Sequence, residues 1–376
     1  MAKLGDIATY INGYAFKPQD WSDEGIPIIR IQDLTGNSYQ ANRYNGEYAS
    51  KYEVNDGDVL ISWSASLGVY IWHGEKAVLN QHIFKVVFDK ERISKDFFVH
   101  QVGLILENAA SDAHGATMKH LTKPVFDALP FYLPPYEKQC EIAEVLDKVT
   151  RLISLRKQQL AKLDELVKAR FVEMFGDCKT NPKNWKTKAL EKIANVGSSK
   201  RVFVEELQDS GIPFYRGTEI GALAGKKAVI PALFITEEHY KQLCETTGKP
   251  QKGDLLMPSI CPDGRIWIVD TDEPFYFKDG RVLWVHLTSA NYNSVFLLYT
   301  LKDRIMTDYA SIASGTTFAE LKIFALKKCK IFDVPLELQN QFANFVERVD
   351  QQKQTVQQSL EKLELMKKAL MQEYFG

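Results

Sequence analysis

Apolar and polar residues follow two different patterns along the chain. From residue 1 to about 133, short alternating runs are separated by turn signals such as Asn55-Asp56-Gly57, a pattern typical of β-strands. A helix is predicted over 95–109, where apolar residues recur at helical spacing, and residues 180–334 repeat this texture with a helix over 293–309. The strands predicted in these two stretches are 26–31, 59–63, 69–72, 83–88, 265–270 and 282–287. Both stretches are therefore predicted to be α+β domains.

Each of these stretches is followed by a long helical segment. Neither Gly nor Pro occurs between Glu137 and Phe175, which predicts a rod of roughly 58 Å at 1.5 Å per residue. Apolar residues step by three and four, as they do where one helix packs along another. Charged residues interrupt this seam at Arg156, Arg170, Lys353 and Lys367. The seam positions are Ile142, Leu146, Val149, Ile153, Leu160, Leu163, Val167, Val349, Val356, Leu360, Leu363 and Leu370.

The two long helices are copies of each other. Residues 344–376 repeat residues 144–176 without a gap, and Leu160 falls on Leu360. The simplest partner for each helix is the other one, in an antiparallel coiled coil with pseudo-twofold symmetry. The alternative is that each helix packs alone on its own domain. Because insertions occur only outside the helix, the copied part is expected to act as a ruler of fixed length.

The duplication also covers the domains. Gly25-Ile26-Pro27 with Arg30 matches Gly211-Ile212-Pro213 with Arg216, and Gly57-Asp58 matches Gly253-Asp254. With 376 residues the chain has room for two domains of ordinary size. The predicted parts are a first domain, a first long helix, a second domain and a second long helix, over residues 1–135, 136–176, 177–335 and 336–376.

Composition narrows the class of protein. The N-terminus has no apolar signal region, and no apolar run is long enough to span a membrane. The five cysteines form no Cys-x-x-Cys pair, so neither a disulfide framework nor a zinc knuckle is expected, and the reducing cytoplasm is the expected location. The net charge of −1 gives no global signal for nucleic acid, although a DNA-binding protein can confine positive charge to one face.

Catalytic motifs are missing from the sequence. It contains no phosphate-binding loop, no zinc-protease or nucleophile-elbow motif, and no metal-ligand spacing among its histidines. Leu133-Pro134-Pro135-Tyr136 resembles the Pro-Pro-aromatic motif of amino-methyltransferases, but Leu133 cannot accept a hydrogen bond from a target amine. We interpret it as a proline stop before the long helix. No metal or cofactor is expected in this chain.

Residues suited to nucleic acid occur at comparable places in both halves. Arg, Asn and Gln can make paired hydrogen bonds to base edges, whereas Lys, Ser and Thr suit phosphates. For any one of them an ordinary solvated role is equally open. Arg30 and Arg216 recur in both copies, which favours a shared structural or phosphate-directed role. The candidates are Arg30, Gln32, Ser62, Trp63, Ser64, Asn80, Gln81, His82, Thr117, Lys119, Lys123, Lys200, Arg201, Arg216, Arg265, Lys278, Arg281, Thr316 and Thr317.

These features together resemble the specificity (S) subunit of type I restriction-modification systems. The elements that carry the resemblance are, in chain order, Leu4-Gly5-Asp6-Ile7-Ala8, Gly25-Ile26-Pro27, Gly57-Asp58-Val59-Leu60, Leu79-Asn80-Gln81, Leu133-Pro134-Pro135 and Met174-Phe175-Gly176. The resemblance covers essentially the whole chain. In the second copy Val334-Pro335-Leu336 replaces Leu-Pro-Pro, and the Asn80-Gln81 pair has no clear counterpart near Asp279-Gly280.

The resemblance implies two target-recognition domains that read the halves of an asymmetric bipartite DNA site. It also implies two methyltransferase (M) subunits that bind S-adenosylmethionine and methylate adenine, and restriction (R) subunits that use ATP and Mg²⁺. The Phe-Gly ends of the helices are expected to meet the opposite recognition domain. Candidate partner-binding residues near one helix end are Gln139, Glu141, Lys148 and Arg151.

Two other functions remain open from the sequence. One is a coiled-coil scaffold whose domains bind proteins without sequence-specific DNA binding. The other is a specificity-like region of a fused restriction enzyme, which we do not expect because the sequence ends at Gly376 with no catalytic domain.

Overall fold

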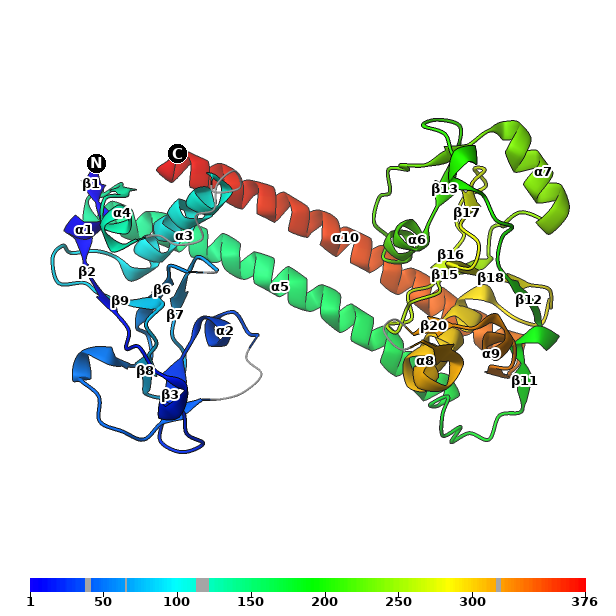
Figure 1. The fold of residues 1–376 in the computed structure, drawn as a ribbon, viewed down its shortest axis with the longest axis horizontal. Helices are drawn as coiled ribbons and strands as arrows, with labels where there is room; N and C mark the ends of the chain where they lie inside the picture. Colours follow the sequence, from blue (N-terminus) through cyan, green and yellow to red (C-terminus); the bar gives the residue numbers. More distant parts are fainter. Residues whose placement is uncertain (38–41, 65, 113–121, 316–318) are drawn as a thin grey trace. The chain divides into compact units, whose positions relative to one another are not determined.

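The computed structural model describes residues 1–37, 42–64, 66–112, 122–315 and 319–376. The chain forms two compact units. Unit 1 comprises residues 1–159 and 356–376, and unit 2 comprises residues 160–355. Each unit holds one mixed α/β domain together with part of both long helices (Figure 1).

The domain of unit 1 is built on antiparallel strands. Its first sheet has the order β2-β9-β6-β7, and its second has the order β4-β3-β8-β5, in which β3 and β8 run parallel. Strands β1 and β10 form a separate pair. The elements are β1 (Ala2–Lys3), α1 (Leu4–Ile7), β2 (Thr9–Asn12), β3 (Ile26–Ile29), α2 (Ile31–Leu34), β4 (Arg43–Tyr44), β5 (Glu53–Val54), β6 (Val59–Ser62), β7 (Gly68–Ile71), β8 (Ala77–Leu79), β9 (Ile83–Val87), α3 (Lys95–Asp112), α4 (Lys123–Asp127) and β10 (Pro130–Phe131).

The domain of unit 2 repeats most of this topology, but its second described sheet lacks a counterpart of β5, and β19 pairs with β20. Its sheets have the orders β12-β18-β15-β16 and β14-β13-β17, with β13 and β17 parallel, and β11 pairs with β21. The elements are β11 (Thr187–Ala189), β12 (Ala194–Gly197), β13 (Ile212–Tyr215), α6 (Gly217–Ala224), β14 (Phe234–Ile235), α7 (Glu237–Thr247), β15 (Leu255–Pro258), β16 (Trp267–Ile268), β17 (Tyr276–Phe277), β18 (Val282–Leu287), α8 (Ser294–Ile312), β19 (Ala313–Ser314), β20 (Glu320–Leu321), α9 (Ile323–Lys327) and β21 (Lys330–Phe332).

Steric crowding requires glycine at the first position of the repeated Gly-Ile-Pro motif. Gly25 and Gly211 have φ values of +99° and +125°, a backbone region that residues with a Cβ atom rarely adopt. A Cβ on Gly25 would lie 2.2 Å from the carbonyl oxygen of Tyr44, and one on Gly211 would lie 2.5 Å from that of Ile235. The motif is therefore repeated because the backbone of the neighbouring strand passes too close for any side chain.

Two of the predicted strands are markedly shorter in the structure. The predicted strand over 26–31 stops at Ile29, because Asp33 accepts a hydrogen bond from the backbone N–H of Arg30 (2.8 Å) and α2 begins at Ile31. The predicted strand over 265–270 is reduced to β16. Arg265 instead belongs to the turn before β16, where its side chain bonds to Asp263. The helices predicted over 95–109 and 293–309 are confirmed as α3 and α8, each slightly longer.

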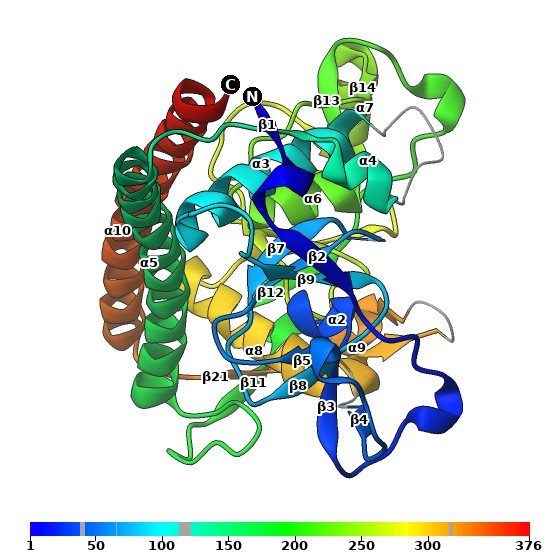
Figure 2. The same ribbon diagram turned by 90° about the vertical axis from the view of Figure 1, so that its left-hand side faces the viewer.

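The two long helices are α5 (Tyr136–Phe175) and α10 (Leu336–Phe375), with 40 residues each. Within each unit they lie side by side in both views (Figure 1 and Figure 2). In unit 1, Lys157 pairs with Glu364 at 2.9 Å, and Arg156 donates to Ser359 at 3.2 Å. Nearer the start of α5, Ile142 and Leu146 share a core with Leu370 and Phe375 of α10. Numbers therefore rise along α5 as they fall along α10, and the helices are antiparallel. The alternative of two unpaired helices is wrong.

In unit 2 the same antiparallel pairing continues. Lys353 forms an ion pair with Asp164, and the guanidinium of Arg170 lies 5.8 Å from the ring centre of Phe345. Arg156, Arg170 and Lys353, three of the four charged residues that interrupt the apolar pattern, thus have partners on the facing helix. Every predicted seam residue is buried or half-buried, and Leu146, at 0% exposure, is the most deeply covered.

The ends of the long helices enter the domain cores as predicted. Phe375 of α10 packs against Phe97 of α3 in unit 1, with ring centres 5.4 Å apart. Phe175 of α5 packs against Phe296 of α8 in unit 2 at 4.8 Å. Each helix therefore begins after one domain and ends inside the core of the other.

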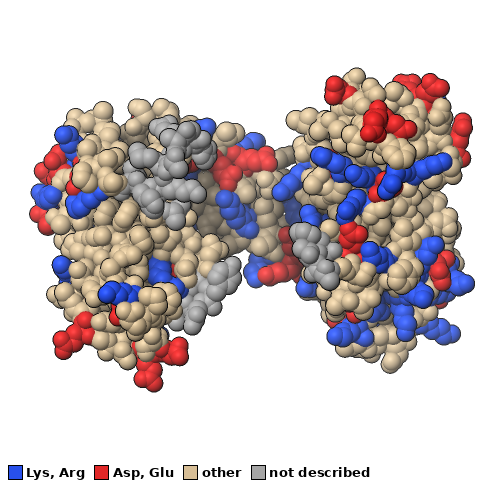
Figure 3. Space-filling view, viewed as in Figure 1, with Lys and Arg blue, Asp and Glu red and all other residues tan. Residues whose placement is uncertain are grey.

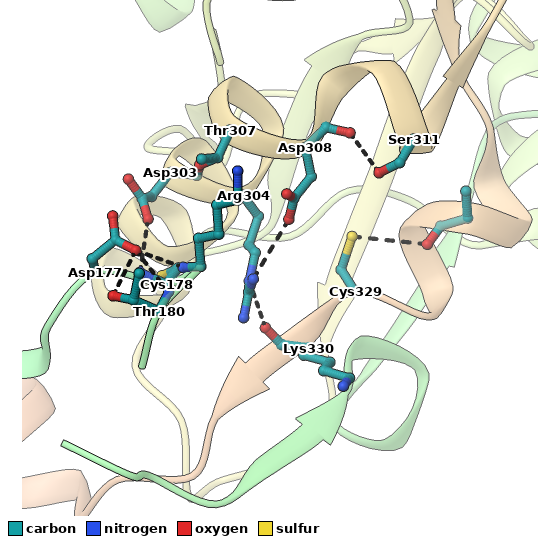
Figure 4. Close-up of polar contacts among 12 residues, drawn as sticks. Asp177, Cys178, Thr180, Asp303, Arg304, Thr307, Asp308, Ser311, Cys329 and Lys330 are labelled. Carbon is teal, nitrogen blue, oxygen red and sulfur yellow. Dashed lines mark hydrogen bonds and ion pairs between the residues drawn. The ribbon is translucent and has the colours of Figure 1, made fainter. Parts of the chain in front are cut away.

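Polar contacts fasten the segment that follows α5 to the second domain (Figure 4). The backbone N–H of Cys178 donates to Asp303 of α8 at 3.2 Å. The neighbouring Arg304 donates through Nε to the carbonyl oxygen of Lys330 in β21 at 3.1 Å. The first bond holds the segment after α5 to α8, and the second joins α8 to β21.

A buried glutamine anchors the start of each long helix. Gln139 is 1% exposed, accepts from the backbone N–H of Ser94 (2.9 Å) and donates to the carbonyl oxygen of Pro134 (2.8 Å). Gln339 makes equivalent bonds with Asn293 and Val334, both at 2.9 Å. The prediction that Gln139 faces a partner subunit is wrong, because a fully bonded, buried amide joins α5 to the segment before α3.

Candidate nucleic-acid interface

Strand pairing in unit 1 brings three loop segments together. Because β3 and β8 run parallel and end side by side, Arg30 and Asn80 follow them as neighbours, and the N–H of Asn80 donates to the carbonyl oxygen of Ile29 (3.1 Å). Strand β6 pairs with β9, which places Trp63 beside His82; their ring centres are 5.5 Å apart. Predicted residues from three separate segments thus lie at one edge of the domain.

The same pairing operates in unit 2. Arg216 and Lys278 follow the parallel strands β13 and β17, and the N–H of Lys278 donates to the carbonyl oxygen of Tyr215 (2.9 Å). Strand β15 pairs with β18, and the N–H of Ser259 donates to the carbonyl oxygen of Arg281 (2.8 Å). The two sets of sequence candidates therefore occupy equivalent positions in the two domains.

The structure shows which residues of unit 2 correspond to the Asn80-Gln81 pair, a counterpart that sequence comparison did not find. The turn between β8 and β9 holds Asn80-Gln81-His82, and the turn between β17 and β18 holds residues 278–281. The second turn is longer, which shifts the alignment and hides the equivalence. Asn80 corresponds to Lys278, because each is the first residue after the parallel strand pair.

In unit 2 these segments surround an open hollow of about 440 Å³. Figure 3 shows Lys and Arg side chains gathered on this face over α6, β16 and β17. Four of the predicted cations line the hollow, together with hydroxyl and backbone groups of the neighbouring loops. The lining residues are Arg216, Gly217, Thr218, Pro258, Ser259, Ile260, Arg265, Lys278 and Arg281. This concentration of positive charge suits phosphate groups and guanine edges.

Carboxylates hold the three arginines of the hollow. Arg216 bonds to Glu219 through Nη2 (2.8 Å) and Nε (3.3 Å). Arg265 bonds to Asp263 through Nε at 2.8 Å, and Arg281 pairs with Glu320. The acids fix where the guanidinium groups point. They also reduce the net charge that the hollow offers to an anion.

Glu219 has a strongly shifted pKa. Burial of its carboxyl group by itself raises the pKa, but hydrogen bonds from the side chains of Arg216 and Thr218 more than compensate and lower it to about 2. The same contact raises the pKa of Arg216. The pair is therefore fully ionised at neutral pH.

Two more predicted cations lie near the turn that holds Lys278. The backbone N–H of Lys200 donates to the hydroxyl oxygen of Tyr276 (3.0 Å), and Arg201 pairs with Asp279 (3.4 Å), next to Lys278. Their side chains are exposed. The predicted Thr316 and Thr317 lie outside the described residues.

Around Trp63 and His82 in unit 1, the described side chains are mainly aromatic rings and amides, and Arg30 lies at the same edge. The indole N–H of Trp63 donates to Asn12 (3.2 Å), and the Trp63 ring stacks on Phe84 at 5.7 Å. The amide nitrogen of Gln81 lies 3.1 Å from Nε2 of His82. Ring faces and amides dominate here, whereas unit 2 presents several guanidinium groups, so the two sites differ in chemistry while sharing a position.

Several predicted residues of unit 1 are structural. Arg30 pairs with Asp33 (3.5 Å), its side chain is only 16% exposed, and its guanidinium lies against the side-chain amide of Gln32. Ser62 is fully buried and donates to the backbone carbonyls of residues 64 and 66, and Ser64 is also buried. A DNA contact through the hydroxyl groups of Ser62 and Ser64 is not supported, because both side chains are buried and that of Ser62 bonds within its own turn. Arg30 and Arg216 share a structural feature, since the backbone N–H of each donates to an acid three residues later at the start of a helix. A phosphate contact of either side chain stays a prediction.

The remaining candidates of unit 1 follow α3. Lys123 begins α4, pairs with Asp127 at 2.7 Å and lies 5.9 Å from the ring centre of Tyr10. The predicted Thr117 and Lys119 lie outside the described residues.

Sequence reasoning missed the acids that orient the arginines. Glu219 follows Arg216 by three residues, and Asp263 precedes Arg265 by two. Such short Arg-acid spacings were the available signal. They were missed because acids are ordinarily counted against an anion-binding site, although here they hold cations in place.

The described residues form no metal-binding cluster, and two of the buried cysteines are unreactive thiols. No three His, Cys, Asp or Glu side chains among these residues come close enough to hold a metal ion. Burial raises the pKa of the Cys261 thiol to about 12 and that of Cys329 to about 11, so neither forms the thiolate that nucleophilic chemistry needs at neutral pH. No described helix is both long and apolar enough for a membrane span.

Comparison with known proteins identifies relatives of the whole chain. The family model of the type I restriction modification DNA specificity domain matches residues 1–165 and 182–365. The MjaVIII specificity subunit of Methanocaldococcus jannaschii is 23% identical over 99% of this chain and 90% of its own length. A type I specificity subunit of Haemophilus influenzae is 28% identical over 86% and 83%. The EcoBI specificity subunit of Escherichia coli is 29% identical, but the match covers 44% of this chain and 35% of that subunit.

Solved structures share the fold. The S subunit of the type I restriction-modification system from M. genitalium aligns over 100% of this chain and 95% of its own, with a TM-score of 0.56 and 14% identity. A chain from a study of complex assembly and conformational transition in the type I system aligns over 100% and 96%, with a TM-score of 0.59 and 16% identity. The family model covers both domains and most of both long helices. The chain therefore belongs to the type I restriction modification DNA specificity family.

Proposed function

We propose that this chain is the DNA sequence-specificity subunit of a type I restriction-modification complex. It binds an asymmetric bipartite DNA site, with one half-site per unit, and directs adenine methylation and DNA cleavage by partner subunits. One observation carries the proposal: equivalent loops of two domains with the same topology present different side chains. Equal topology brings the same loops to DNA, and different side chains select different bases.

The charge distribution supports DNA as the ligand. Lysines and arginines outnumber acids over residues 177–335, although acids outnumber them over 1–135. The positive charge gathers in the hollow that Arg265 and Lys278 help to line, where phosphates supply most of the affinity of a DNA-binding protein. The near-neutral total charge therefore hides one cationic surface.

The long helices suit the role of a spacer. Both are continuous, and each is rooted in a domain by a buried glutamine at one end and a phenylalanine at the other. A change of helix length would rotate the helix end by about 100° per residue. This coupling explains why the helical copies align without a gap.

Catalysis is assigned to the partners. In this proposal two methyltransferase subunits bind S-adenosylmethionine, and restriction subunits bind ATP and Mg²⁺, all in the cytoplasm. A candidate methyltransferase surface lies on α5 in unit 1, where Leu152 and Leu155 are 43% and 47% exposed. They lie beside the exposed residues Lys148 and Arg151. Exposed leucines rimmed by charge are typical of protein interfaces.

A domain exchange tests the proposal. Residues 1–133 are replaced by the recognition domain of another family member, the chain is co-expressed with its methyltransferase subunits, and methylated adenines are mapped by single-molecule sequencing. We expect one half of the target to change and the other to stay. The reciprocal exchange of residues 177–335 is the control and should change the other half. An unchanged target in both halves would refute the proposal.

The scaffold function makes a different prediction. It requires sequence-independent or absent DNA binding even when methyltransferase subunits are present. Footprinting of the assembled methyltransferase complex on random DNA fragments distinguishes the scaffold function from the specificity function. Protection of one defined bipartite site is expected only of a specificity subunit.

A further inference from the structure

We infer that unit 2 reads a guanine in its half-site through Arg265, while Lys278 holds a phosphate of the same half-site. The inference rests on the proposed function and adds to it the chemistry of one half of the target. It follows from how each cation of the hollow is held.

Arg265 has the geometry of a base reader. Asp263 engages its Nε, with Nε–O distances of 3.0 and 2.8 Å to the two carboxylate oxygens. Within the described residues, the two terminal amino groups of Arg265 make no hydrogen bond. A guanidinium held from behind, with its outer edge available, can donate both hydrogen bonds that the O6 and N7 atoms of guanine accept in the major groove.

The neighbouring helix leaves room for this guanidinium. Nη1 of Arg265 would lie 3.0 Å from a Cβ placed on Gly221 of α6, so a larger residue at 221 would crowd the guanidinium. The side chain of Arg265 remains 47% exposed at the wall of the hollow. It is thus oriented by contacts on one side and accessible on the other.

The other cations of the hollow are less suited to base reading. Arg216 uses Nε and Nη2 on Glu219, and Arg281 is paired with Glu320. Lys278 has no acid within ion-pair distance among the described residues, and its compact ammonium carries charge without a paired-donor geometry. We therefore assign Lys278 to a phosphate and Arg265 to the base.

Unit 1 has no arginine at the corresponding place. In the hairpins that follow β6 and β15, Leu60 pairs with Tyr70 and Leu256 pairs with Trp267. Counting two residues back from Tyr70 and Trp267 places Gly68 where unit 2 has Arg265. The half-site of unit 1 is therefore read without this contact, and the guanine is assigned to the half-site of unit 2.

The experiment uses the full chain assembled with its methyltransferase subunits in a host without adenine methylation. Methylated sites are mapped for the native chain, Arg265→Ala and Arg265→Lys. We expect a guanine at one fixed position in the half that changes when residues 177–335 are exchanged. Both variants should relax that position by roughly tenfold to a hundredfold while leaving the other half intact. Arg265→Lys keeps the charge, so relaxation in this variant shows that the paired donors matter.

Two further variants separate the roles. Asp263→Asn should relax the same position less than Arg265→Lys does, because the guanidinium remains but loses its holder. Lys278→Gln should weaken binding at every target and lower the slope of log affinity against log salt by about 0.9. Lys252→Gln is the matched control, since Lys252 is 63% exposed and lies outside the hollow.

The outcomes distinguish the inference from the proposed function. If exchange of residues 177–335 leaves the target unchanged, the proposed function itself fails. If the exchange changes one half but that half has no guanine, or if Arg265→Lys keeps the native preference at every position, only the inference is overturned. Co-purification of each variant with the methyltransferase subunits verifies that it is folded.

Discussion

The buried glutamines that anchor the long helices allow a quantitative test. Replacement of Gln139 by Met keeps an unbranched side chain of similar length but removes both hydrogen-bonding groups. The backbone N–H of Ser94 and the carbonyl oxygen of Pro134 then lose partners at 2.9 and 2.8 Å. Each group left unpaired in a buried place costs about 1–3 kcal/mol, and added apolar burial offsets part of this. The expected loss of local stability is about 2–4 kcal/mol.

Hydrogen-exchange mass spectrometry can localise this loss. At about 1.4 kcal/mol per factor of ten, backbone amides of residues 94–98 and 139–142 should exchange roughly 30- to 1000-fold faster. Gln158→Met is the control, because Gln158 is an exposed residue of the same helix. Gln339→Met should have a larger effect on unit 2, since Gln339 also donates to the carbonyl oxygen of Asn291 (3.1 Å).

One result would refute the reasoning. If exchange near Ser94 in Gln139→Met stays within about threefold of the Gln158→Met control, the glutamine does not hold α5 to its domain. The anchoring would then have to come from apolar packing alone.

Three other changes have expected outcomes. Leu160→Pro should destabilise the middle of α5 by about 3 kcal/mol or more and prevent co-purification of two methyltransferase subunits. The control Leu160→Ala should keep the helix. Intact assembly of the proline variant with both methyltransferase subunits would contradict this prediction. In urea denaturation, Leu146→Ala should lower the free energy of unfolding of unit 1 by about 2–5 kcal/mol, because Leu146 is 0% exposed. The control Leu155→Ala alters a side chain that is 47% exposed, so it should change this free energy by less than about 0.5 kcal/mol. Glu219 has its pKa lowered from 4.5 to about 2, so its stabilising contribution is complete above pH 4.5 and disappears as the pH falls toward 2. Glu219→Gln should therefore remove on the order of 1–2 kcal/mol of the acid sensitivity of unit 2. Identical profiles of unfolding free energy against pH for the native chain and the variant would argue against the ion pair.

Local patterns were sufficient to predict much of the fold. The three-and-four spacing of Leu146, Val149 and Ile153 marks one face of a helix, and helical hydrogen bonds join residues only four apart. The limits of α5 and α10 could therefore be predicted closely, as could their antiparallel pairing from the gapless repeat. The same reasoning misplaced Gln139, because a polar residue in a helical pattern ordinarily faces water. Its burial depends on Ser94, which lies 45 residues away.

The hollow of unit 2 could be predicted only in part. The sequence identified Arg216, Arg265 and Lys278 as candidates, but nothing in their spacing shows that they share a surface. They meet because β13 pairs in parallel with β17 and because β15 lies between β16 and β18. Such pairings join residues far apart along the chain, and their energy depends on how whole sheets pack.

The residue sequence thus establishes that the chain is a duplicated pair of α+β domains joined by long helices, because repeats and periodicity are linear properties. The choice between base reader, phosphate contact and structural residue comes from the folded molecule. Arg30 and Arg216 begin their helices in the same way, yet Arg30 is largely buried whereas Arg216 lines an open hollow. That difference arises from the side chains brought around each arginine by distant segments, and it sets which charges can reach DNA.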